Sequence, residues 1–430
     1  MPITRIKVDN FRSFQSIDID LRKLNIVVGT NASGKSNFVQ IFRFLNDAVE
    51  QGLENAISIQ GGQDYITNAK IRAEQKSSIE MHFSPELDTE IPWPIPVRKS
   101  ARKTLAPQII SGSFRIEIGF KRRGKGIKTV ESTLTLATRI YSYKRKGKSF
   151  VRHEDMGSEV RLTIKGSNLR KKATILMESS GENILSENDL FPETLRRWLD
   201  LGGGRYDLPL AKYLSYLILP HIVGGTAIYD FDPKMAKRGA QITGRVELEG
   251  DGSNLALVLR RVVKDKSREK KFLTLISDLL PFIDRIGTQD SADKSVLVKA
   301  KERYYPKTFV YAPFMSDGTI NVIALVLALY FSYKPLIIIE EPERNIHPYL
   351  IDKVMDMMDD ASNKTQIIVT THNAVLVGNA DPQNVILMSR DSDGFSRVSR
   401  PCQKEEVKEF LRKEIGLGEL LEQNLLEDLT

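Results

Sequence analysis

The sequence holds few of the residues that cross-link, anchor or ligate a protein. Its only cysteine, Cys402, excludes an intrachain disulfide and favours a reducing compartment. The longest apolar run, Val322 to Phe331, is about half of a membrane span, and no apolar leader follows Met1. The five histidines form no cluster with cysteine and no H-E-x-x-H motif, which argues against a zinc site. These absences predict a globular, cytoplasmic protein.

Positive charge is present but unevenly placed. The 430 residues carry a formal net charge of +8, and an apolar share of 41% is enough for more than one packed core. The stretch from Arg98 to Lys172 contains 21 Lys/Arg and five Asp/Glu, so the remainder of the chain is net acidic. This asymmetry predicts a negatively charged partner for the basic stretch.

A glycine-rich motif organises the chain. The apolar run Ile26-Val27-Val28 leads into G-x-x-x-x-G-K-S, and helical spacing of apolar residues begins at Phe38. This order of strand, loop and helix predicts a P-loop, whose backbone N–H groups surround a phosphate. We expect Lys35 on the terminal phosphates and the Ser36 hydroxyl on Mg²⁺, with ATP and Mg²⁺ as cofactors. The residues expected at the nucleotide are Gly29, Thr30, Asn31, Ala32, Ser33, Gly34, Lys35, Ser36 and Asn37.

Two further apolar runs end in polar residues. Leu336–Ile339 is followed by Glu340 and Glu341, and such a strand end beside a P-loop places one carboxylate at Mg²⁺ and the next at the attacking water. His372 follows the next apolar run after two threonines. A histidine there either senses the γ-phosphate or caps a turn.

A third motif, Met315-Ser316-Asp317-Gly318-Thr319, opens a helix predicted from Asn321. Its N–H groups make a second anion-binding site. A phosphate that is already bound by the P-loop, however, needs no second binding loop from the same chain. Two interpretations stay open: ordinary capping by Ser316 or Asp317, and a site for ATP bound to another copy.

The apolar pattern predicts four consecutive regions. Residues 1–90 form the first part of an α/β head, with strands at 3–8, 17–21 and 77–83. Residues 91–180 form a basic antiparallel β-lobe, with strands that include 130–136 and 140–143 and turns at 123–126 and 146–148. Residues 181–300 are predicted to be mainly helical, with segments at 195–199, 212–217, 255–263 and 272–286 and N-cap chemistry at 251–254. Residues 301–430 return to buried strands between helices, which is typical of a parallel sheet, so the sheet of the P-loop strand is predicted to be completed from the far end of the sequence.

As a set, these motifs resemble the ABC-type ATPase heads of the RecF, SMC and OLD kind, and especially the stand-alone ATPases often labelled AAA family. The set is G-x-x-x-x-G-K-S, S-D-G-T, I-I-I-E-E-P-E-x-x-I-H-P and T-T-H, and residues 229–233, 251–255 and 417–421 also resemble that subgroup. The expected fold class is therefore α/β: an ABC-type P-loop head, with a mixed sheet and flanking helices, an inserted basic β-lobe and a helical region.

The resemblance implies roles for individual residues. Glu340 matches the Walker B acid at Mg²⁺, where aspartate is more usual, and Glu341 matches the catalytic base. His372 matches the switch histidine. Ser316 and Gly318 match a signature that acts on the ATP of a second copy, in a loose version of leucine-serine-glycine-glycine.

Other matches extend the expected site. Arg12 falls where some relatives bring an arginine towards the nucleotide, and Asn345 and His347 fall where these heads have a D-loop. No Q-loop glutamine is assigned, and Gln63 is one candidate.

Basic residues at or near the turns of the β-lobe are the candidates for contact with nucleic acid. Three partners stay open: nucleic acid, an acidic protein, or none, with the charge serving only solvation. The candidates are Lys121, Arg122, Arg123, Lys144, Arg145 and Lys146.

The sequence thus predicts an ATPase that dimerises head to tail on ATP and couples hydrolysis to DNA repair or defence against foreign DNA. The alternative is an ATP-gated scaffold that holds and releases a separate nuclease or toxin. Ser316 lies 281 residues after Lys35, farther than a transporter's nucleotide-binding domain is expected to place its signature.

The chain is also expected to cut no nucleic acid by itself. OLD-like nucleases carry a Toprim domain after the ATPase, and the 58 residues after His372 are too few for one. The pair Asp391 and Asp393 lies in a predicted hairpin turn rather than at a metal site.

Overall fold

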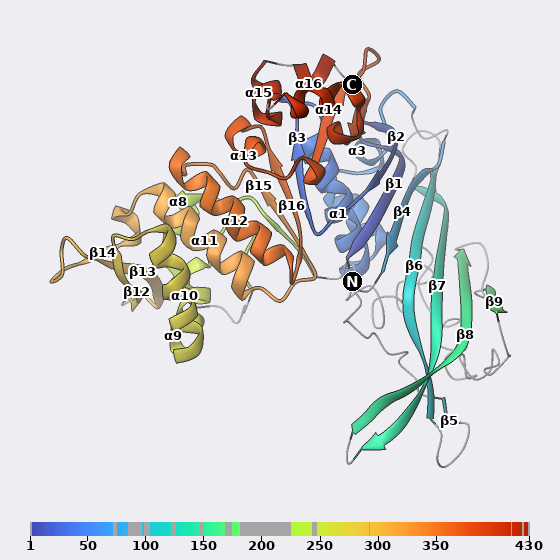
Figure 1. The fold of residues 1–430 in the computed structure, drawn as a ribbon, viewed down its shortest axis with the longest axis horizontal. Helices are drawn as coiled ribbons and strands as arrows, with labels where there is room; N and C mark the ends of the chain where they lie inside the picture. The colour runs from blue at the N-terminus through green and yellow to red at the C-terminus, as the bar shows by residue number, and fades with distance from the viewer. Residues whose placement is uncertain are drawn as a thin grey trace. The chain divides into compact units, whose positions relative to one another are not determined.

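The computed structural model describes residues 2–71, 75–84, 97–98, 104–121, 126–146, 149–167, 174–180, 225–242, 247–291, 293–413, 415–423 and 425–428. The chain divides into two compact units (Figure 1). The first comprises Met1–Arg22, Ser36–Gly225 and Arg390–Val398, and the second comprises Lys23–Lys35, Thr226–Ser389 and Ser399–Thr430.

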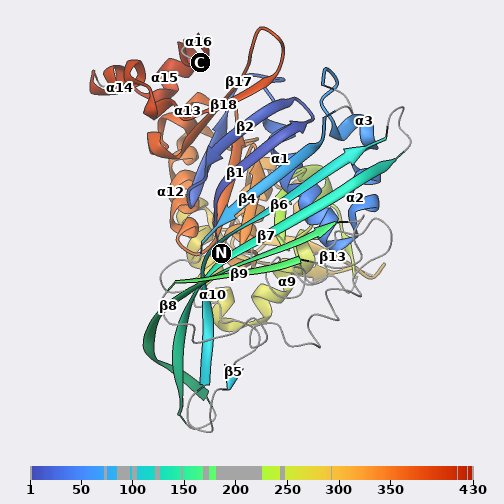
Figure 2. The ribbon, with the colours of Figure 1, turned by 90° about the vertical axis from the view of Figure 1, so that its right-hand side faces the viewer.

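The first unit is built on one antiparallel sheet in the order β2-β1-β4-β6-β7-β8-β9, with β5 on β6 (Figure 2). Apolar residues alternate along β1, so that Ile6 and Val8 are buried opposite Ile19 and Ile17 of β2. The strands are β1 (Ile3–Phe11), β2 (Phe14–Asp20), β4 (Ser77–Phe83), β5 (Val97–Arg98), β6 (Thr104–Phe120), β7 (Ile127–Lys146), β8 (Ser149–Ser167) and β9 (Thr174–Ser180).

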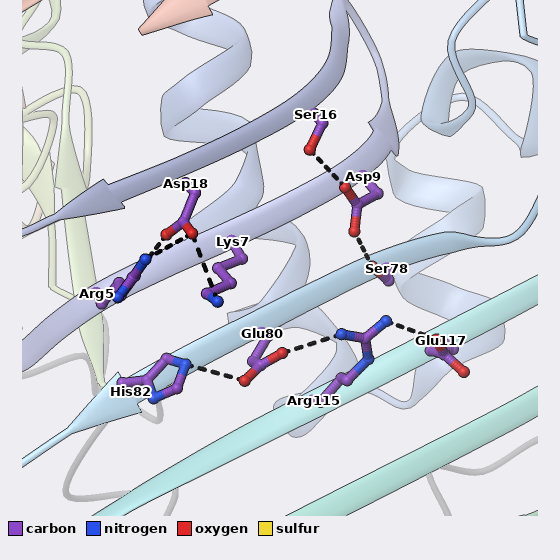
Figure 3. Close-up of polar contacts among 10 residues, drawn as sticks. All are labelled: Arg5, Lys7, Asp9, Ser16, Asp18, Ser78, Glu80, His82, Arg115 and Glu117. Atoms are coloured by element: carbon purple, nitrogen blue, oxygen red, sulfur yellow. Dashed lines mark hydrogen bonds and ion pairs between the residues drawn. The ribbon is translucent and has the colours of Figure 1, made fainter. Parts of the chain in front are cut away.

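The other face of this sheet carries a ladder of charged and hydroxyl side chains (Figure 3). Arg5 donates two hydrogen bonds to Asp18, at 2.5 and 2.7 Å. Arg115 on β6 bridges Glu80 and Glu117, at 3.0 and 2.7 Å. Opposite charges on neighbouring strands stabilise such a face, and the alternation explains why the N-terminal strands are readable from sequence.

The expected boundary at residue 90 does not separate two sheets. Ser77–Phe83 pairs with Gly112–Ile118, so the sheet of the N-terminal strands continues into the basic hairpins. Two short strands were expected at 130–136 and 140–143, but β7 runs unbroken from Ile127 to Lys146. Continuous pairing with β6 and β8 carries β7 through Thr138 and Arg139, with irregular register near them.

Among the described residues, three helices follow or separate the strands of this sheet along the chain. They are α1 (Lys35–Glu50), α2 (Leu53–Ile59) and α3 (Gln63–Ile66). The boundary between the two units falls inside the first turn of α1. Buried Phe38, Ile41, Phe42 and Leu45 recur on α1 at helical spacing, as the sequence predicted.

The second unit is built on a parallel sheet in the order β10-β15-β16-β3-β17. Every residue of β3 and β16 is buried, as in a sheet covered on both faces. The strand before the P-loop thus pairs with strands from the last third of the chain, which confirms the prediction. The strands are β3 (Leu24–Val28), β10 (Thr226–Tyr229), β15 (Leu336–Glu340), β16 (Gln366–Thr371) and β17 (Val385–Arg390).

Helices α9 to α12 pack with this sheet into one apolar core (Figure 1). The helical elements of this part are α8 (Pro233–Ala236), α9 (Leu255–Lys264), α10 (Lys266–Leu279), η3 (Ala312–Phe314), α11 (Asp317–Phe331), η4 (Pro348–Leu350) and α12 (Ile351–Ser362). Later in the chain come α13 (Ala374–Gly378), η5 (Pro382–Asn384), β18 (Ser396–Ser399), η6 (Pro401–Gln403), α14 (Glu405–Arg412), α15 (Leu417–Glu422) and α16 (Leu425–Asp428). No helix among the described residues is long and apolar enough to cross a membrane.

A second, small sheet corrects the expectation of a mainly helical region at 181–300. Its order is β11-β13-β12, with β14 on β13, and its strands are β11 (Ala240–Gln241), β12 (Ile283–Asp290), β13 (Ser295–Glu302) and β14 (Phe309–Tyr311). The helix predicted over 272–286 ends at Leu279, because Pro281 cannot continue it, and Ile283 begins a strand. The amphipathic segments predicted at 195–199 and 212–217 lie outside the described residues.

The N-cap expected before Leu255 is also corrected. Asn254 occupies the N-cap position, but its side chain makes no capping bond. The side-chain Oδ1 of Asn254 accepts from the Glu249 N–H at 2.9 Å, and its Nδ2 donates to the Glu247 backbone carbonyl at 2.7 Å. Asn254 therefore closes the loop before α9 instead of capping the helix.

Candidate active site

The ends of four adjacent parallel strands bring the predicted residues to one edge of the sheet. The P-loop follows β3, His372 follows β16, Glu340 ends β15 and Asp230 follows β10. Parallel strands end at the same edge, and ligands of such sheets bind there. Glu340 lies in register with Thr370, which places the Walker B acids beside the histidine loop.

The P-loop has the backbone that a phosphate cradle needs. Ala32 and Gly34 have positive φ angles of 64° and 116°, and a Cβ on Gly29 would lie 2.2 Å from the Met388 carbonyl oxygen. The Lys35 ammonium donates to the carbonyl oxygens of Gly29 and Thr30, at 2.6 and 2.9 Å. A lysine folded over its own loop, at the start of a helix, fits the anionic phosphates of ATP.

Glu341 has a strained backbone and a fully engaged carboxylate. Its φ of 47° is unusual for a residue with a side chain, and its N–H donates to the Thr370 carbonyl at 2.8 Å. Oε1 lies 2.9 Å from His372 Nδ1, and Oε2 lies 2.9 Å from Arg344 Nη2. The structure thus brings together the residues predicted as base and switch.

The charges around Glu341 keep it ionised. Burial raises the pKa of Glu341, but the hydrogen bond from Arg344 and the charges of His372 and Arg344 outweigh that effect. The net pKa lies below the ordinary value of 4.5. An ionised carboxylate can accept a proton, which is the chemistry of a general base.

Arg344 and Asp230 complete this cluster, although neither was predicted from the sequence to be a site residue. Arg344 Nη1 donates to Asp230 at 2.9 Å while Nη2 holds Glu341, so one guanidinium links the ends of β10 and β15. Asp230 directly follows the apolar strand β10, which is the pattern that identified Glu340. The same signal could therefore have found it.

Glu343 is buried beneath the histidine loop. Its side chain accepts a hydrogen bond from the Thr371 hydroxyl, and the same hydroxyl accepts from the Asn373 N–H at 2.9 Å. Glu343 is 8% exposed, and its Oε2 has no partner among the described residues. Burial raises the pKa of Glu343, which the Thr371 hydrogen bond offsets only in part. Glu343 thus holds Thr371, and the Thr371 hydroxyl in turn holds Asn373 on the other side of His372.

The signature residues begin α11 and pack on the segment after Walker B. Ser316 caps α11 by accepting from the Thr319 N–H at 3.1 Å, so capping is part of its role. A Cβ on Gly318 would lie 2.5 Å from the Asn345 carbonyl oxygen, and Asn321 donates to the Arg344 carbonyl at 2.6 Å. Gly318 is thus required for close packing of the signature on the D-loop position.

The three weaker sequence motifs, at 229–233, 251–255 and 417–421, prove to be structural supports. Asp230 and Asp232 donate from their backbone N–H groups to the carbonyls of Gly250 and Asp251, at 2.9 and 3.1 Å, which joins the motifs at 229–233 and 251–255. A Cβ on Gly418 would lie 2.4 Å from the Ala374 carbonyl, because α15 packs tightly on α13. The terminal motif therefore supports the helix that follows His372.

Other predicted site residues lie in the first unit. The Arg12 backbone has a φ of 51°, its guanidinium donates to Gln60, and burial lowers its pKa. Asn37 donates to Ser13 at 2.8 Å. Gln63 is buried and donates to the carbonyl of Lys121, the residue directly after β6, at 3.3 Å.

The basic turns are only partly described. Lys121 is exposed at the end of β6, while Arg122 and Arg123 lie outside the described residues, as do the side chains of Lys144, Arg145 and Lys146. Within the sheet, Arg139 pairs with Glu159 at 2.5 Å. Part of the positive charge of this region is therefore neutralised internally.

Asp391 and Asp393 lie in a turn, as predicted. The Gly394 N–H donates to the Asp391 carbonyl at 2.8 Å, and the Asp391 carboxylate binds Arg397 at 2.8 Å. The described residues contain no group of three or more His, Cys, Asp or Glu that could hold a metal ion.

Comparison with known proteins agrees with this geometry. Residues 1–191 match the family described as "AAA ATPase domain", and residues 242–378 match "AAA domain, putative AbiEii toxin, Type IV TA system". The "DNA replication and repair protein RecF" of Actinobacillus pleuropneumoniae is 31% identical over 74 residues, which are 16% of this chain and 21% of that protein. The RecF of Desulforudis audaxviator is 51% identical over 45 residues, 10% of this chain and 12% of that protein.

A solved structure shows the same fold. An SMC head bound to the C-winged helix domain of ScpA aligns with a TM-score of 0.50 at 14% identity, over 93% of this chain and 98% of that one. The chain spans only about a fifth, or less, of the length of these RecF relatives. Together, the fold, the site and the matches support an ABC-type P-loop ATPase of the RecF/SMC-like class.

Proposed function

We propose that this chain hydrolyses ATP, with Glu341 as the general base. The observation that carries this proposal is the contact of an ionised Glu341 with His372 at the sheet edge that also bears the P-loop. Glu341 would accept a proton from the water that attacks the terminal phosphate. His372 orients the carboxylate through Oε1, and Arg344 does so through Oε2.

The residues for nucleotide and metal follow from the P-loop. Its backbone and Lys35 would hold the phosphates, while the hydroxyl of Ser36 and the carboxylate of Glu340 would be the metal ligands. Bound Mg²⁺ supplies positive charge that stabilises the phosphate oxygens during transfer. The protein itself positions the phosphates and supplies the proton acceptor, Glu341.

The second part of the proposal is ATP-driven dimerisation, head to tail. Ser316 is exposed at the start of α11, a helix of 15 residues whose N-terminus favours an anion. The P-loop already serves the phosphates of its own ATP. We therefore assign Ser316 and Gly318 to the ATP of a second copy.

The third part is a nucleic-acid transaction, in DNA repair or in defence against foreign DNA. Its support is the excess of basic residues between Arg98 and Lys172, in a chain otherwise net acidic, and the partial likeness to proteins named for DNA replication and repair. Duplex DNA would bind at the basic turns through its phosphates.

The test is phosphate release by the purified chain with Mg²⁺, with and without duplex DNA. Turnover that duplex DNA raises supports the proposal, and Lys35→Ala sets the background. Absence of turnover above that background contradicts hydrolysis. Turnover that duplex DNA and RNA leave unchanged contradicts the coupling.

A second candidate function rests on the match of residues 242–378 to a family whose description names a toxin system. In this alternative, the ATP state controls whether the chain binds or releases a separate nuclease or toxin. A pull-down from native cells, with and without nuclease treatment, separates the two. A partner that survives nuclease treatment and leaves on ATP hydrolysis favours the scaffold.

A further inference from the structure

The small sheet of β11, β12, β13 and β14 has one buried and one open face. Val296, Val298 and Ala300 of β13 are buried in the core of the second unit, against α9. Leu297, Lys299 and Lys301 alternate with them and point away from that core. On β14, Phe309 is 40% exposed and Tyr311 is 36% exposed.

The open face carries aromatic and basic side chains in alternation. Lys301 pairs in register with Phe309, and Lys299 with Tyr311, so two lysines lie beside two aromatic rings (β13 and β14, Figure 1). The Lys299 ammonium lies 4.8 Å from the centroid of the Phe309 ring. Val310, between the two rings, packs on the core instead.

The turn between β13 and β14 extends this surface. Tyr304 is 75% exposed and Tyr305 is 64% exposed, with Arg303 and Lys307 beside them. Backbone hydrogen bonds order the turn, from the Tyr305 N–H to Glu302 and from the Thr308 N–H to Tyr305, both at 3.1 Å. We call Lys299, Lys301, Tyr304, Tyr305, Lys307, Phe309 and Tyr311 the aromatic–lysine face.

We propose that the aromatic–lysine face binds single-stranded nucleic acid. Exposed rings offer stacking surfaces to bases, and the lysines between them neutralise phosphates, which is the combination that single strands require. In a duplex the bases are already stacked on one another, so exposed aromatic side chains have little base surface on which to stack. A protein interface would be depleted in lysine at its centre, whereas two lysines lie between these rings.

This surface is separate from the basic turns proposed for duplex DNA, and its binding requires no ATP. The two proposals therefore fail independently. DNA and RNA strands share the bases and phosphates that the face recognises, so the experiment decides which of the two it binds.

The experiment measures fluorescence anisotropy of labelled oligo-dT and oligo-rU of about 20 nucleotides, without nucleotide triphosphate. The full chain should bind at least one of them. Phe309→Ala/Tyr311→Ala should weaken binding at least about tenfold, the scale of losing base stacking. Tyr304→Ala/Tyr305→Ala gives a second variant whose exposed rings are not needed for folding, and Tyr311→Phe should retain binding.

Lysine removal tests the phosphate contacts separately. Lys301→Gln/Lys307→Gln should reduce the slope of log affinity against log salt by about 0.7 for each lysine lost. Matched controls are Tyr65→Ala, an exposed tyrosine of α3, and Lys364→Gln, an exposed lysine before β16, and both should bind normally. Thermal unfolding confirms that each variant folds.

Three outcomes overturn the proposal. They are no binding of either oligonucleotide by the full chain, equal binding by both aromatic double variants, and loss of binding when only the basic turns are charge-reversed. Cross-linking of a 5-iodouracil oligonucleotide to the peptide 303–311, found by mass spectrometry, supports it directly. A chain that binds neither strand but binds an acidic polypeptide through this face has a protein site there instead.

Discussion

Glu341 Oε1 and His372 Nδ1 lie 2.9 Å apart, although 31 positions separate the two residues in the chain. They meet because β15 and β16 are parallel neighbours that end at the same edge. The contact orients the carboxylate, and the opposite oxygen is held by Arg344.

Glu341→Gln should bind ATP normally but hydrolyse it at least about a hundredfold more slowly. The amide keeps the shape of the side chain and loses the proton acceptor, which is the loss expected for a general base. Single-turnover phosphate release and nucleotide binding measure the two effects. Glu406→Gln, an exposed glutamate of α14, is the matched control. Near-normal turnover by Glu341→Gln would place the base elsewhere.

Arg344→Ala should lower kcat about tenfold and leave the KM for ATP within about twofold. The guanidinium donates charge-assisted hydrogen bonds to Glu341, and their loss frees the carboxylate to rotate. Steady-state kinetics decide this, with Lys353→Ala on α12 as a control. Faster turnover would show that Arg344 restrains the base.

Glu343→Gln should stabilise the protein increasingly as pH rises. Because the folded-state pKa of Glu343 is raised above 4.5, its contribution to stability is fully present below the unfolded pKa and is lost as pH rises through the folded pKa. The glutamine has no such loss. The difference in Tm between Glu343→Gln and the parent should therefore grow from pH 5 to pH 8.

A control separates charge from contact at this position. Glu343→Ala removes the hydrogen bond from Thr371 as well, and should lower Tm at every pH. A Tm difference for Glu343→Gln that stays constant with pH would mean that Glu343 titrates normally.

Ser316→Arg should keep nucleotide affinity and lose both turnover and ATP-driven association. A bulky cation at the start of α11 blocks the approach of a second copy, while the P-loop lies elsewhere on the chain. Sedimentation of Glu341→Gln, with and without ATP, measures the association directly. A sedimentation coefficient that ATP leaves unchanged would contradict the composite site.

Charge reversal at the basic turns should abolish binding of duplex DNA and spare basal hydrolysis. Phosphate contacts dominate such binding, so the parent's affinity should fall steeply with salt and depend little on sequence. The reversed residues are Lys121, Arg122, Arg123, Lys144, Arg145 and Lys146. Duplex binding that survives the reversal would redirect attention to an acidic protein partner.

The sequence alone determined the motifs whose chemistry is local. A P-loop binds phosphate through consecutive backbone groups, so Gly29 to Ser36 can be recognised without knowing what surrounds them. The buried strands of the parallel sheet were readable because each contains consecutive apolar residues, and Glu340 and Glu341 because they follow such a run.

Only the tertiary structure decided which strands are neighbours. Long-range pairing joined the N-terminal strands and the basic hairpins into one sheet. It also placed His372 against Glu341 and Asp230 against Arg344. These contacts join residues far apart in sequence, and no periodicity within one segment reports which segment it will meet.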